Sequence, residues 1–183
     1  MPEYWEKETS THIFFYGGPF SNWFKCHFFS NFKADGKLIE FNCSEQYMMA
    51  AKANLFKDLE IYNLIMKCRD PASQKALGKA VKGFSDEVWL PAARSIVYNG
   101  CYDKFFQNDR LFSILMSTGD KILVEGSPTD KLWGVGYHAE DYRITNLNRW
   151  TGKNWLGQVL MKVRLDLSNS HNDCFEEIEW DKI

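Results

Sequence analysis

Residues 42–53, Asn-Cys-Ser-Glu-Gln-Tyr-Met-Met-Ala-Ala-Lys-Ala, constrain the fold most strongly because they predict a helix with a chemically distinct face. Glu45 and Lys52 lie seven residues apart in this segment, which is close to two helical turns. Their side chains therefore project from one face, roughly 10 Å apart along the helix axis. A carboxylate and an amine on one face can serve as a proton shuttle and as a cation or nucleophile.

The same segment also has a purely structural interpretation. Asn42 as the N-cap, with Glu45 three residues later, would form a capping box. An acid in the first turn also stabilises the helix dipole, and Lys52 would then lie along the surface. Both interpretations remain open from these residues alone.

The chain has the length of one domain, and its composition narrows the class of protein. It contains 183 residues, of which 45% are hydrophobic and 16% aromatic. No run of about 18 apolar residues predicts a membrane span, and the N-terminal residues are too charged for a secretory signal. We therefore expect a cytoplasmic protein, with the nucleus as the alternative location. The seven Trp predict that some indole rings line a pocket.

The cysteines and histidines give no sign of a metal site. The five Cys are irregularly spaced without a C-x-x-C pair, and only four His are present. Free thiols are therefore expected rather than a disulfide framework or a structural zinc. Because the zinc-protease, nucleophile-elbow and Walker motifs are also absent from the sequence, we expect no metal and no cofactor.

Acidic residues are concentrated near the C-terminus. Residues 166–183 contain six acids and one base, which leaves 21 bases and 18 acids in the remainder of the chain. We therefore predict a main domain over residues 1–165 and an acidic extension over 166–183. The mildly basic main domain can bind a phosphorylated ligand, but the absence of a dense Lys/Arg stripe predicts only modest contact with a polynucleotide.

Apolar periodicity and turn residues predict more helix than strand. Strands are expected at 13–16, 37–41 and 122–125, and helices from 42 to beyond 56, at 70–83, 85–106 and 109–116, and from about 154 onward. The predicted strands and helices do not alternate regularly, so a parallel sheet is not expected. We therefore expect an α+β fold, a predominantly helical single domain with a small, mainly antiparallel sheet.

Three further segments can carry chemistry, and each has a structural alternative. Residues 130–136 follow a predicted strand. Here Asp130 can contact a sugar, Trp133 can stack on a flat ring, and Gly134 can let a ligand approach the backbone; the alternative is a tight turn. Residues 152–157 open the last helix, where backbone N–H groups and Asn154 can bind a phosphate; the alternative is plain capping. Residues 17–23 form either a binding loop or a hairpin turn.

Together these segments resemble one known family. Tyr-Gly-Gly-Pro-Phe-Ser-Asn-Trp (16–23), Ser-Glu-Gln-Tyr-Met-Met-Ala-Ala-Lys-Ala (44–53), Asp-Lys-Leu-Trp-Gly-Val-Gly (130–136) and Gly-Lys-Asn-Trp-Leu-Gly-Gln-Val-Leu-Met-Lys-Val-Arg (152–164) are similar to motifs of the NADAR, or YbiA-like, superfamily. The resemblance runs in the family's order over residues 14–164. It implies an N-glycosidase that removes ADP-ribose from guanine in nucleic acid. The alternatives are a hydrolase of phosphoribosylamino-pyrimidine intermediates of riboflavin synthesis, a non-catalytic ADP-ribose-binding module and a nucleic-acid-binding module.

The resemblance also implies roles for individual residues. It implies a metal-independent enzyme whose partners are ADP-ribose or a ribosylated base and ADP-ribosylated DNA, without a membrane. The first loop is matched by Phe20-Ser21-Asn22, although Phe29-Ser30-Asn31 is a second copy of the pattern. The catalytic candidates are Glu45, Lys52 and Asp130, and the substrate-binding candidates are Gly18, Ser21, Asn22, Trp89, Trp133, Gly134, Asn154 and Gly157.

Overall fold

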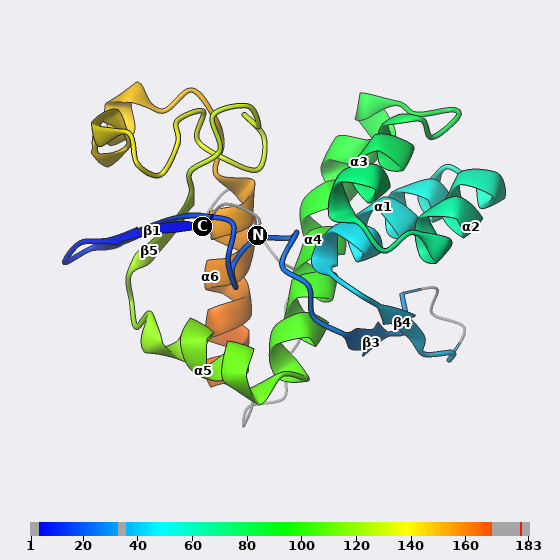
Figure 1. Ribbon diagram of the computed structural model, residues 1–183, viewed down its shortest axis with the longest axis horizontal. Coiled ribbons are helices and arrows are strands. Elements are labelled where there is room, and N and C mark those ends of the chain that lie inside the picture. Colours follow the sequence, from blue (N-terminus) through cyan, green and yellow to red (C-terminus); the bar gives the residue numbers. More distant parts are fainter. Residues whose placement is uncertain (1–3, 33–35, 170–179, 181–183) are drawn as a thin grey trace. The chain divides into compact units, whose positions relative to one another are not determined.

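The structure is a computed structural model that describes residues 4–32, 36–169 and 180. Within it the chain forms two compact units (Figure 1). The first unit is assembled from both ends of the chain, Met1–Ser21 and Asp109–Ile183, and the second is the continuous segment Asn22–Asn108.

The continuous unit is a helical cluster with a short hairpin. Its helix α1 packs against α2, α3 and α4 and touches β4. Nine of the twelve α1 residues are buried, so this helix is the centre of the unit and lacks a broad solvent face. The elements are β3 (Phe28–Ser30), β4 (Ile39–Phe41), α1 (Ser44–Leu55), α2 (Leu59–Lys67), α3 (Pro71–Lys79) and α4 (Asp86–Phe106).

Local capping and aromatic packing explain these elements. The Asp58 and Asp70 carboxylates accept the N–H groups three residues ahead, which fixes the starts of α2 and α3. The antiparallel β3–β4 pair packs on α1 through Phe28, Phe41 and Tyr47. The Gln107 amide donates to and accepts from the backbone of Phe29, so a side chain covers the outer edge of β3.

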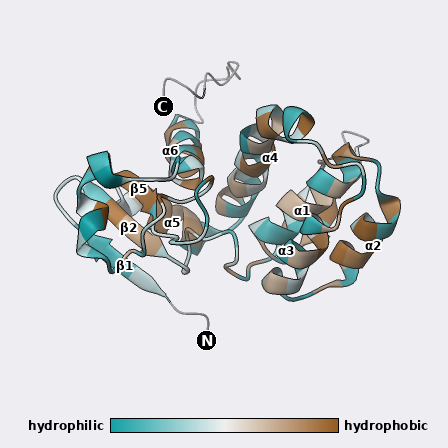
Figure 2. Cartoon of the chain, turned by 90° about the horizontal axis from the view of Figure 1, so that it is seen from above, coloured by the Kyte–Doolittle hydropathy of each residue, from teal (hydrophilic) through white to brown (hydrophobic). Residues whose placement is uncertain are grey.

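The unit formed by the chain ends contains a three-stranded mixed sheet in the order β1–β2–β5, with β1 (Trp5–Glu8), β2 (His12–Tyr16) and β5 (Ile122–Glu125). β1 pairs antiparallel with β2, and β2 pairs parallel with β5. The helix α6 (Trp155–Ser168) packs on β5, and α5 (Asp109–Ser117) packs on α6. Hydrophobic residues of β2 and β5 appear brown in Figure 2.

A loop with two 3₁₀ turns, η1 (Tyr142–Thr145) and η2 (Leu147–Arg149), follows β5 in the chain. It closes a small core of Phe14, Val124, Val135, Ala139 and Ile144.

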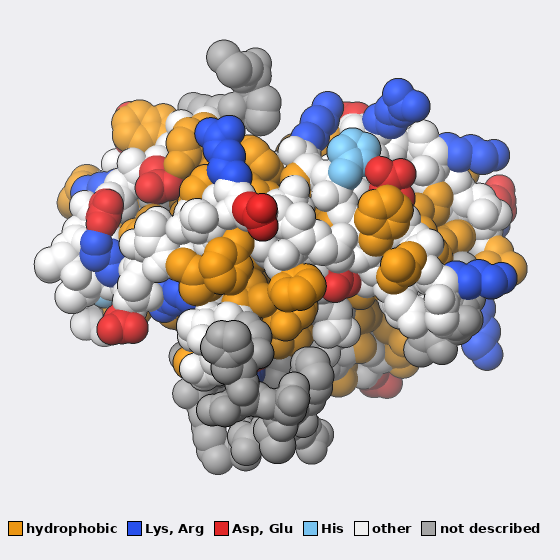
Figure 3. Space-filling model, turned by 90° about the horizontal axis from the view of Figure 1, so that it is seen from below, with side chains coloured by type: hydrophobic (Ala, Val, Ile, Leu, Met, Phe, Trp, Pro, Cys, Tyr) orange, Lys and Arg blue, Asp and Glu red, His pale blue; other side chains and the backbone are white. Residues whose placement is uncertain are grey.

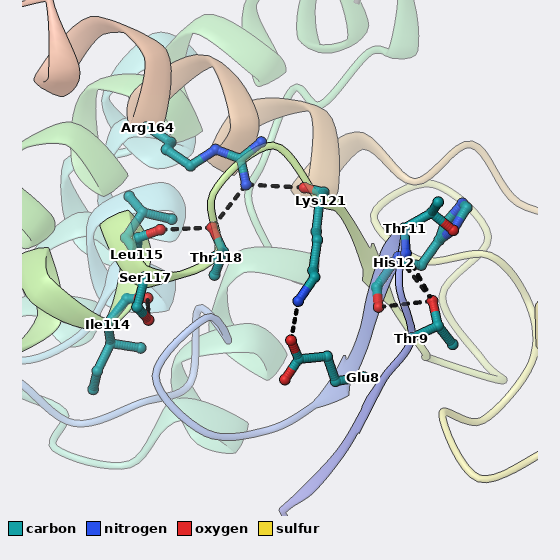
Figure 4. Close-up of polar contacts among 10 residues, drawn as sticks. All are labelled: Glu8, Thr9, Thr11, His12, Ile114, Leu115, Ser117, Thr118, Lys121 and Arg164. Atoms are coloured by element: carbon teal, nitrogen blue, oxygen red, sulfur yellow. Dashed lines mark hydrogen bonds and ion pairs between the residues drawn. The ribbon is translucent and has the colours of Figure 1, made fainter.

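Polar contacts join the elements of this unit (Figure 4). An Arg164 Nη atom on α6 donates to Thr118 Oγ1 at 2.7 Å and to the Lys121 carbonyl oxygen at 2.9 Å. Lys121 in turn forms an ion pair with Glu8 of β1. The turn between α5 and β5 is thus held from both sides.

The structure confirms the predicted α+β fold, mostly helical with small mixed and antiparallel sheets. The helix predicted to begin at Asn42 is instead two helices, because the chain turns at Lys57, which has a positive φ of 58°. The strands β1 and β3 were not predicted. Every side chain of β1 is exposed, so that strand has no inside–outside alternation to detect.

The structure describes little of the predicted acidic extension. Most of the predicted acidic extension, residues 170–179 and 181–183, lies outside the described residues, and its boundary stays a prediction. No helix in the described part of the chain is long and apolar enough to cross a membrane. Hydrophobic side chains do reach the surface among charged ones on the face drawn in Figure 3.

Candidate active site

The start of α1 differs from the predicted capping box. Cys43 is the N-cap, and its Sγ accepts the N–H of Gln46 at 3.4 Å. The Gln46 side-chain oxygen accepts the N–H of Asn42 at 2.8 Å. The prediction that Asn42 and Glu45 form the cap was therefore wrong, because α1 begins one residue later and Gln46 occupies the reciprocal position. The Glu45 side chain is not needed for capping.

Glu45 is held in the interior of the continuous unit by its backbone. Its side chain is only 2% exposed, and its N–H donates to the Asn22 carbonyl oxygen at 2.8 Å. The Asn22 side chain is also buried, and its oxygen accepts the Cys101 thiol at 3.7 Å. Asn31, in the second Phe-Ser-Asn copy, is exposed. The structure therefore places the first copy beside Glu45.

Lys52 lies between two aromatic rings at the other end of α1. Its Nζ atom is 4.0 Å from the ring centre of Phe84 and 5.5 Å from that of Trp89. Burial lowers the pKa of the Lys52 amine below its ordinary 10.5, and the nearby Asp86 carboxylate partly opposes this effect. The neutral, nucleophilic amine is therefore easier to form than for a lysine in water.

The buried thiols of this unit are poor nucleophiles by comparison. Burial raises the pKa of Cys43 to about 12 and that of Cys101 to about 11, so both are protonated near neutral pH. Lys104 is fully buried among them, and burial lowers the pKa of its amine. Within the described residues, Cys26, Cys43, Cys68 and Cys101 are free thiols, as predicted, whereas Cys174 lies outside the described residues. The partly exposed Lys52 is thus the better placed nucleophile.

In the unit formed by the chain ends, Asp130 stabilises a tight turn. Its Oδ1 atom accepts the N–H groups of Leu132 and Trp133 at 3.1 and 2.9 Å. Trp133 is half-buried and makes an edge contact with Trp155, with ring centres 5.8 Å apart. A Cβ on Gly134 would lie 2.9 Å from the Asp130 carbonyl oxygen, so this glycine allows the turn to close. The structural alternative is realised here, and the ligand roles stay predictions.

Asn154 and Gly157 allow α6 to pack closely on β5. The Asn154 side chain accepts the N–H of Glu125 at 3.0 Å and donates to the Leu123 carbonyl oxygen at 2.9 Å. Asn154 is the N-cap residue of α6, with φ of 53°, but its side chain makes no capping hydrogen bond, so the capping alternative holds for its position and not for its side chain. A Cβ on Gly157 would lie 2.0 Å from the Leu123 carbonyl oxygen. Its hydrogen allows α6 to approach β5 this closely.

The glycine-rich turn after β2 also has a packing role. Gly17 and Gly18 both have positive φ, and a Cβ on Gly18 would collide with the Tyr4 ring at 2.0 Å. The Gly18 carbonyl oxygen accepts the N–H of the buried Ser21 at 3.1 Å. The chain does turn here, but β2 pairs with β1 and β5 and not with β3, so the hairpin alternative was wrong. Contact of Gly18 and Ser21 with a substrate stays a prediction.

Within the continuous unit, the structure brings Asn22 to Glu45 and Trp89 to Lys52. Sequence reasoning missed Phe84, whose ring is nearest to the Lys52 amine; its only signal is an aromatic residue just before a helix start. It also missed Glu125, a carboxylate only 8% exposed at the end of β5. An acid that ends a buried apolar strand is a detectable signal, because burying a carboxylate is costly.

The chain is similar to several known proteins. A family model described as the NADAR domain matches residues 4–168. The chain is 39% identical to N-glycosidase R617 of Acanthamoeba polyphaga mimivirus over 165 residues, which cover 86% of this chain and 96% of that protein. It is 37% identical to protein irg-1 of Caenorhabditis elegans over 174 residues, 88% and 82% of the two chains. The NMR structure of Escherichia coli YbiA is similar, with a TM-score of 0.69, 25% identity and coverage of 93% and 92%.

Proposed function

Because the chain belongs to the NADAR family and is an N-glycosidase of that family, we propose that it hydrolyses the N-ribosyl bond between ADP-ribose and guanine in nucleic acid. The observation that carries this proposal is the Lys52 amine, held 4.0 Å from the Phe84 ring centre on the same helix as the buried Glu45. Such a pair supplies an amine for the sugar carbon and an acid for the departing base.

The reaction proceeds through an imine between Lys52 and the ribose. The C1–O4 bond of the ribose breaks while the lone pair of the guanine nitrogen forms a double bond to C1, and Glu45 gives a proton to O4. The unprotonated Lys52 nitrogen then adds to C1 and returns a proton to Glu45, which restores the single bond between C1 and the guanine nitrogen. The bond from C1 to the guanine nitrogen then breaks, its electron pair stays on the base, and Glu45 gives the base a proton. Water next adds to the C1–lysine imine, and the amine leaves as the free sugar aldehyde forms. The overall change is the addition of one water across the C1–nitrogen bond.

The lowered pKa of the Lys52 amine supports this route over simple anion binding. A lysine that only anchors a phosphate benefits from a full positive charge, whereas imine formation needs the unprotonated amine. Burial removes water from the Lys52 amine and favours the unprotonated form, although the faces of the Phe84 and Trp89 rings attract the charged form. The two rings also offer flat surfaces on which a base can stack.

The test is product analysis on defined substrates. The protein is incubated with an oligonucleotide carrying ADP-ribosyl-guanine and, separately, with phosphoribosylamino-pyrimidines, with and without EDTA. We expect release of ADP-ribose from the first substrate, which leaves an oligonucleotide with unmodified guanine, at a rate that EDTA leaves unchanged. Release of pyrimidine alone would assign the riboflavin substrates instead, and loss of activity in EDTA would contradict metal independence. Binding of ADP-ribose without turnover would identify a non-catalytic reader.

Borohydride added during turnover tests the covalent step. It should attach an ADP-ribose mass to a peptide containing Lys52, because reduction makes the imine permanent. Lys52→Arg keeps the positive charge and should abolish both labelling and turnover, whereas Lys67→Arg, at an exposed position on α2, should change neither. Normal hydrolysis by Lys52→Arg would refute the covalent route.

A further inference from the structure

Trp23 is an exposed indole on a loop that is fixed in place. It is 39% exposed, although the loop around it is tied to the start of α1 on both sides. On one side Asn22 accepts the Glu45 N–H, and on the other the Cys26 N–H donates to the Asn42 carbonyl oxygen at 3.0 Å. A large apolar ring held out toward water on a rigid loop is a preformed surface for stacking.

The side chain of Lys75, on α3, lies near the Trp23 ring. Its Nζ atom lies 5.9 Å from the Trp23 ring centre. The neighbouring Gln74 is completely buried, donates to the Asn42 side chain at 3.1 Å and accepts the Cys43 thiol at 3.1 Å. Lys75 is therefore positioned by contacts to the same end of α1 that positions Trp23.

These two side chains share a location and complement one chemistry. Trp23 is one residue from the carbonyl group that binds the Glu45 N–H, and Lys75 is one residue from the amide that binds Asn42. A flat ring next to a cation suits a nucleobase that carries phosphate. The second aromatic pair, Phe84 and Trp89, lies about two helical turns along α1, at Lys52.

We propose that Trp23 and Lys75 form a subsite for the adenosine diphosphate end of the substrate, with adenine stacked on the indole and a phosphate near the lysine. This inference rests on the proposed function for the identity of the ligand. It assigns the Glu45 end of α1 to a group with a large flat ring, which a simple phosphoribosyl substrate lacks.

The test combines truncation of the ligand with truncation of the side chain. Calorimetry measures the affinity of ADP-ribose and of ribose 5-phosphate, which lacks the adenosine and one phosphate, for the wild-type protein and for Trp23→Ala. We expect the variant to lose affinity for ADP-ribose by on the order of tenfold to a hundredfold, the range for loss of one base stack. Its affinity for ribose 5-phosphate should stay within about twofold.

Three further variants sharpen the result. Trp23→Phe should retain most of the affinity because it keeps a stacking ring. Lys75→Ala should weaken ADP-ribose binding less at high salt, where charge interactions are screened. Trp5→Ala removes another exposed indole, 38% exposed on β1, and should change neither affinity.

The inference is overturned if Trp23→Ala weakens both ligands equally or weakens neither, or if the wild-type protein binds ADP-ribose no more tightly than ribose 5-phosphate. Turnover answers a separate question. If the protein does not cleave ADP-ribosyl-guanine but binds adenosine diphosphate through Trp23, the subsite is supported and the proposed reaction is refuted. If the protein cleaves this substrate and Trp23→Ala has no effect on binding, the reaction is supported and the subsite is refuted.

Discussion

The variant Gly157→Ala tests whether the first turn of α6 has a structural role or contacts a ligand. The added methyl carbon would lie 2.0 Å from the Leu123 carbonyl oxygen and 2.4 Å from the Asn154 side-chain nitrogen. Carbon–oxygen contacts normally begin at about 3.3 Å, so α6 or β5 must move by more than about 1 Å. That movement breaks the two hydrogen bonds that Asn154 makes to the backbone of Leu123 and Glu125.

The magnitude follows from these two effects. Overpacking costs about 1–3 kcal/mol, and each buried backbone group left without a partner costs about 1–3 kcal/mol. One collision and two unpaired backbone groups together cost about 3–9 kcal/mol, so we expect the free energy of unfolding to fall by at least about 3 kcal/mol, a decrease in Tm of at least about 6 °C for a chain of this size. Asn154→Ala removes the same hydrogen bonds without the collision and should cost about 2–4 kcal/mol.

Calorimetric and urea unfolding measure these losses, and ADP-ribose affinity is measured well below each Tm. Gly119→Ala is the matched control, because its Cβ would meet open space and only the positive φ of 54° opposes it, at a cost of about 1–2 kcal/mol. The structural reasoning is refuted if Gly157→Ala unfolds like the wild-type protein but binds ADP-ribose tenfold more weakly. That outcome would place a ligand against Gly157.

Three other measurements test the continuous unit. Glu45→Gln should lower turnover by about 10²–10⁴-fold with unchanged unfolding, and a near-normal rate would return Glu45 to a structural role. Asp86→Asn should lower the pKa of the Lys52 amine further, because the Asp86 carboxylate opposes the effect of burial, so the acid limb of the kcat profile moves to lower pH. Glu87→Gln, at the next position in the first turn of α4, should leave the limb in place, and an unshifted limb in Asp86→Asn would contradict the argument. Burial lowers the pKa of Lys104 in the folded protein below the 10.5 of the unfolded chain. Between these two pKa values the unfolded chain binds more protons than the folded protein, so the free energy of unfolding rises with pH in that range. Urea unfolding should therefore show the wild-type protein gaining stability relative to Lys104→Met as pH rises from about 7 toward 10, and a constant difference would show that Lys104 does not titrate in this way.

Locally encoded features were predictable from the sequence. Asp70 followed by Pro71 gave the start of α3, because a side-chain cap and a fixed φ act over a few residues. The α1 cap was mispredicted because a thiol, Cys43, replaces the usual oxygen acceptor. The Lys57 turn was missed because a lysine with positive φ carries no turn signal.

The candidate site was predictable only in part. Spacing alone placed Glu45 and Lys52 on one helix, since helical geometry is local. The rings that enclose Lys52 come from the loop before α4 and from α4 itself, and periodicity does not report such tertiary contacts. Asn154 was identified as important, but its two bonds to β5 depend on a contact between segments about thirty residues apart, which no local rule supplies.

The parallel pairing of β2 with β5 has a consequence for biosynthesis. β2 ends at Tyr16 and its partner begins at Ile122, so the whole continuous unit is translated between them. At 5–20 residues per second the ribosome needs on the order of 5–20 s to cover that distance. During this interval β1 can pair with one edge of β2, while the unpaired backbone N–H and C=O groups of the edge that later pairs with β5 stay open to other nascent chains. Chaperone binding to the nascent protein should therefore be strongest over residues 12–16 and should decline once β5 leaves the exit tunnel.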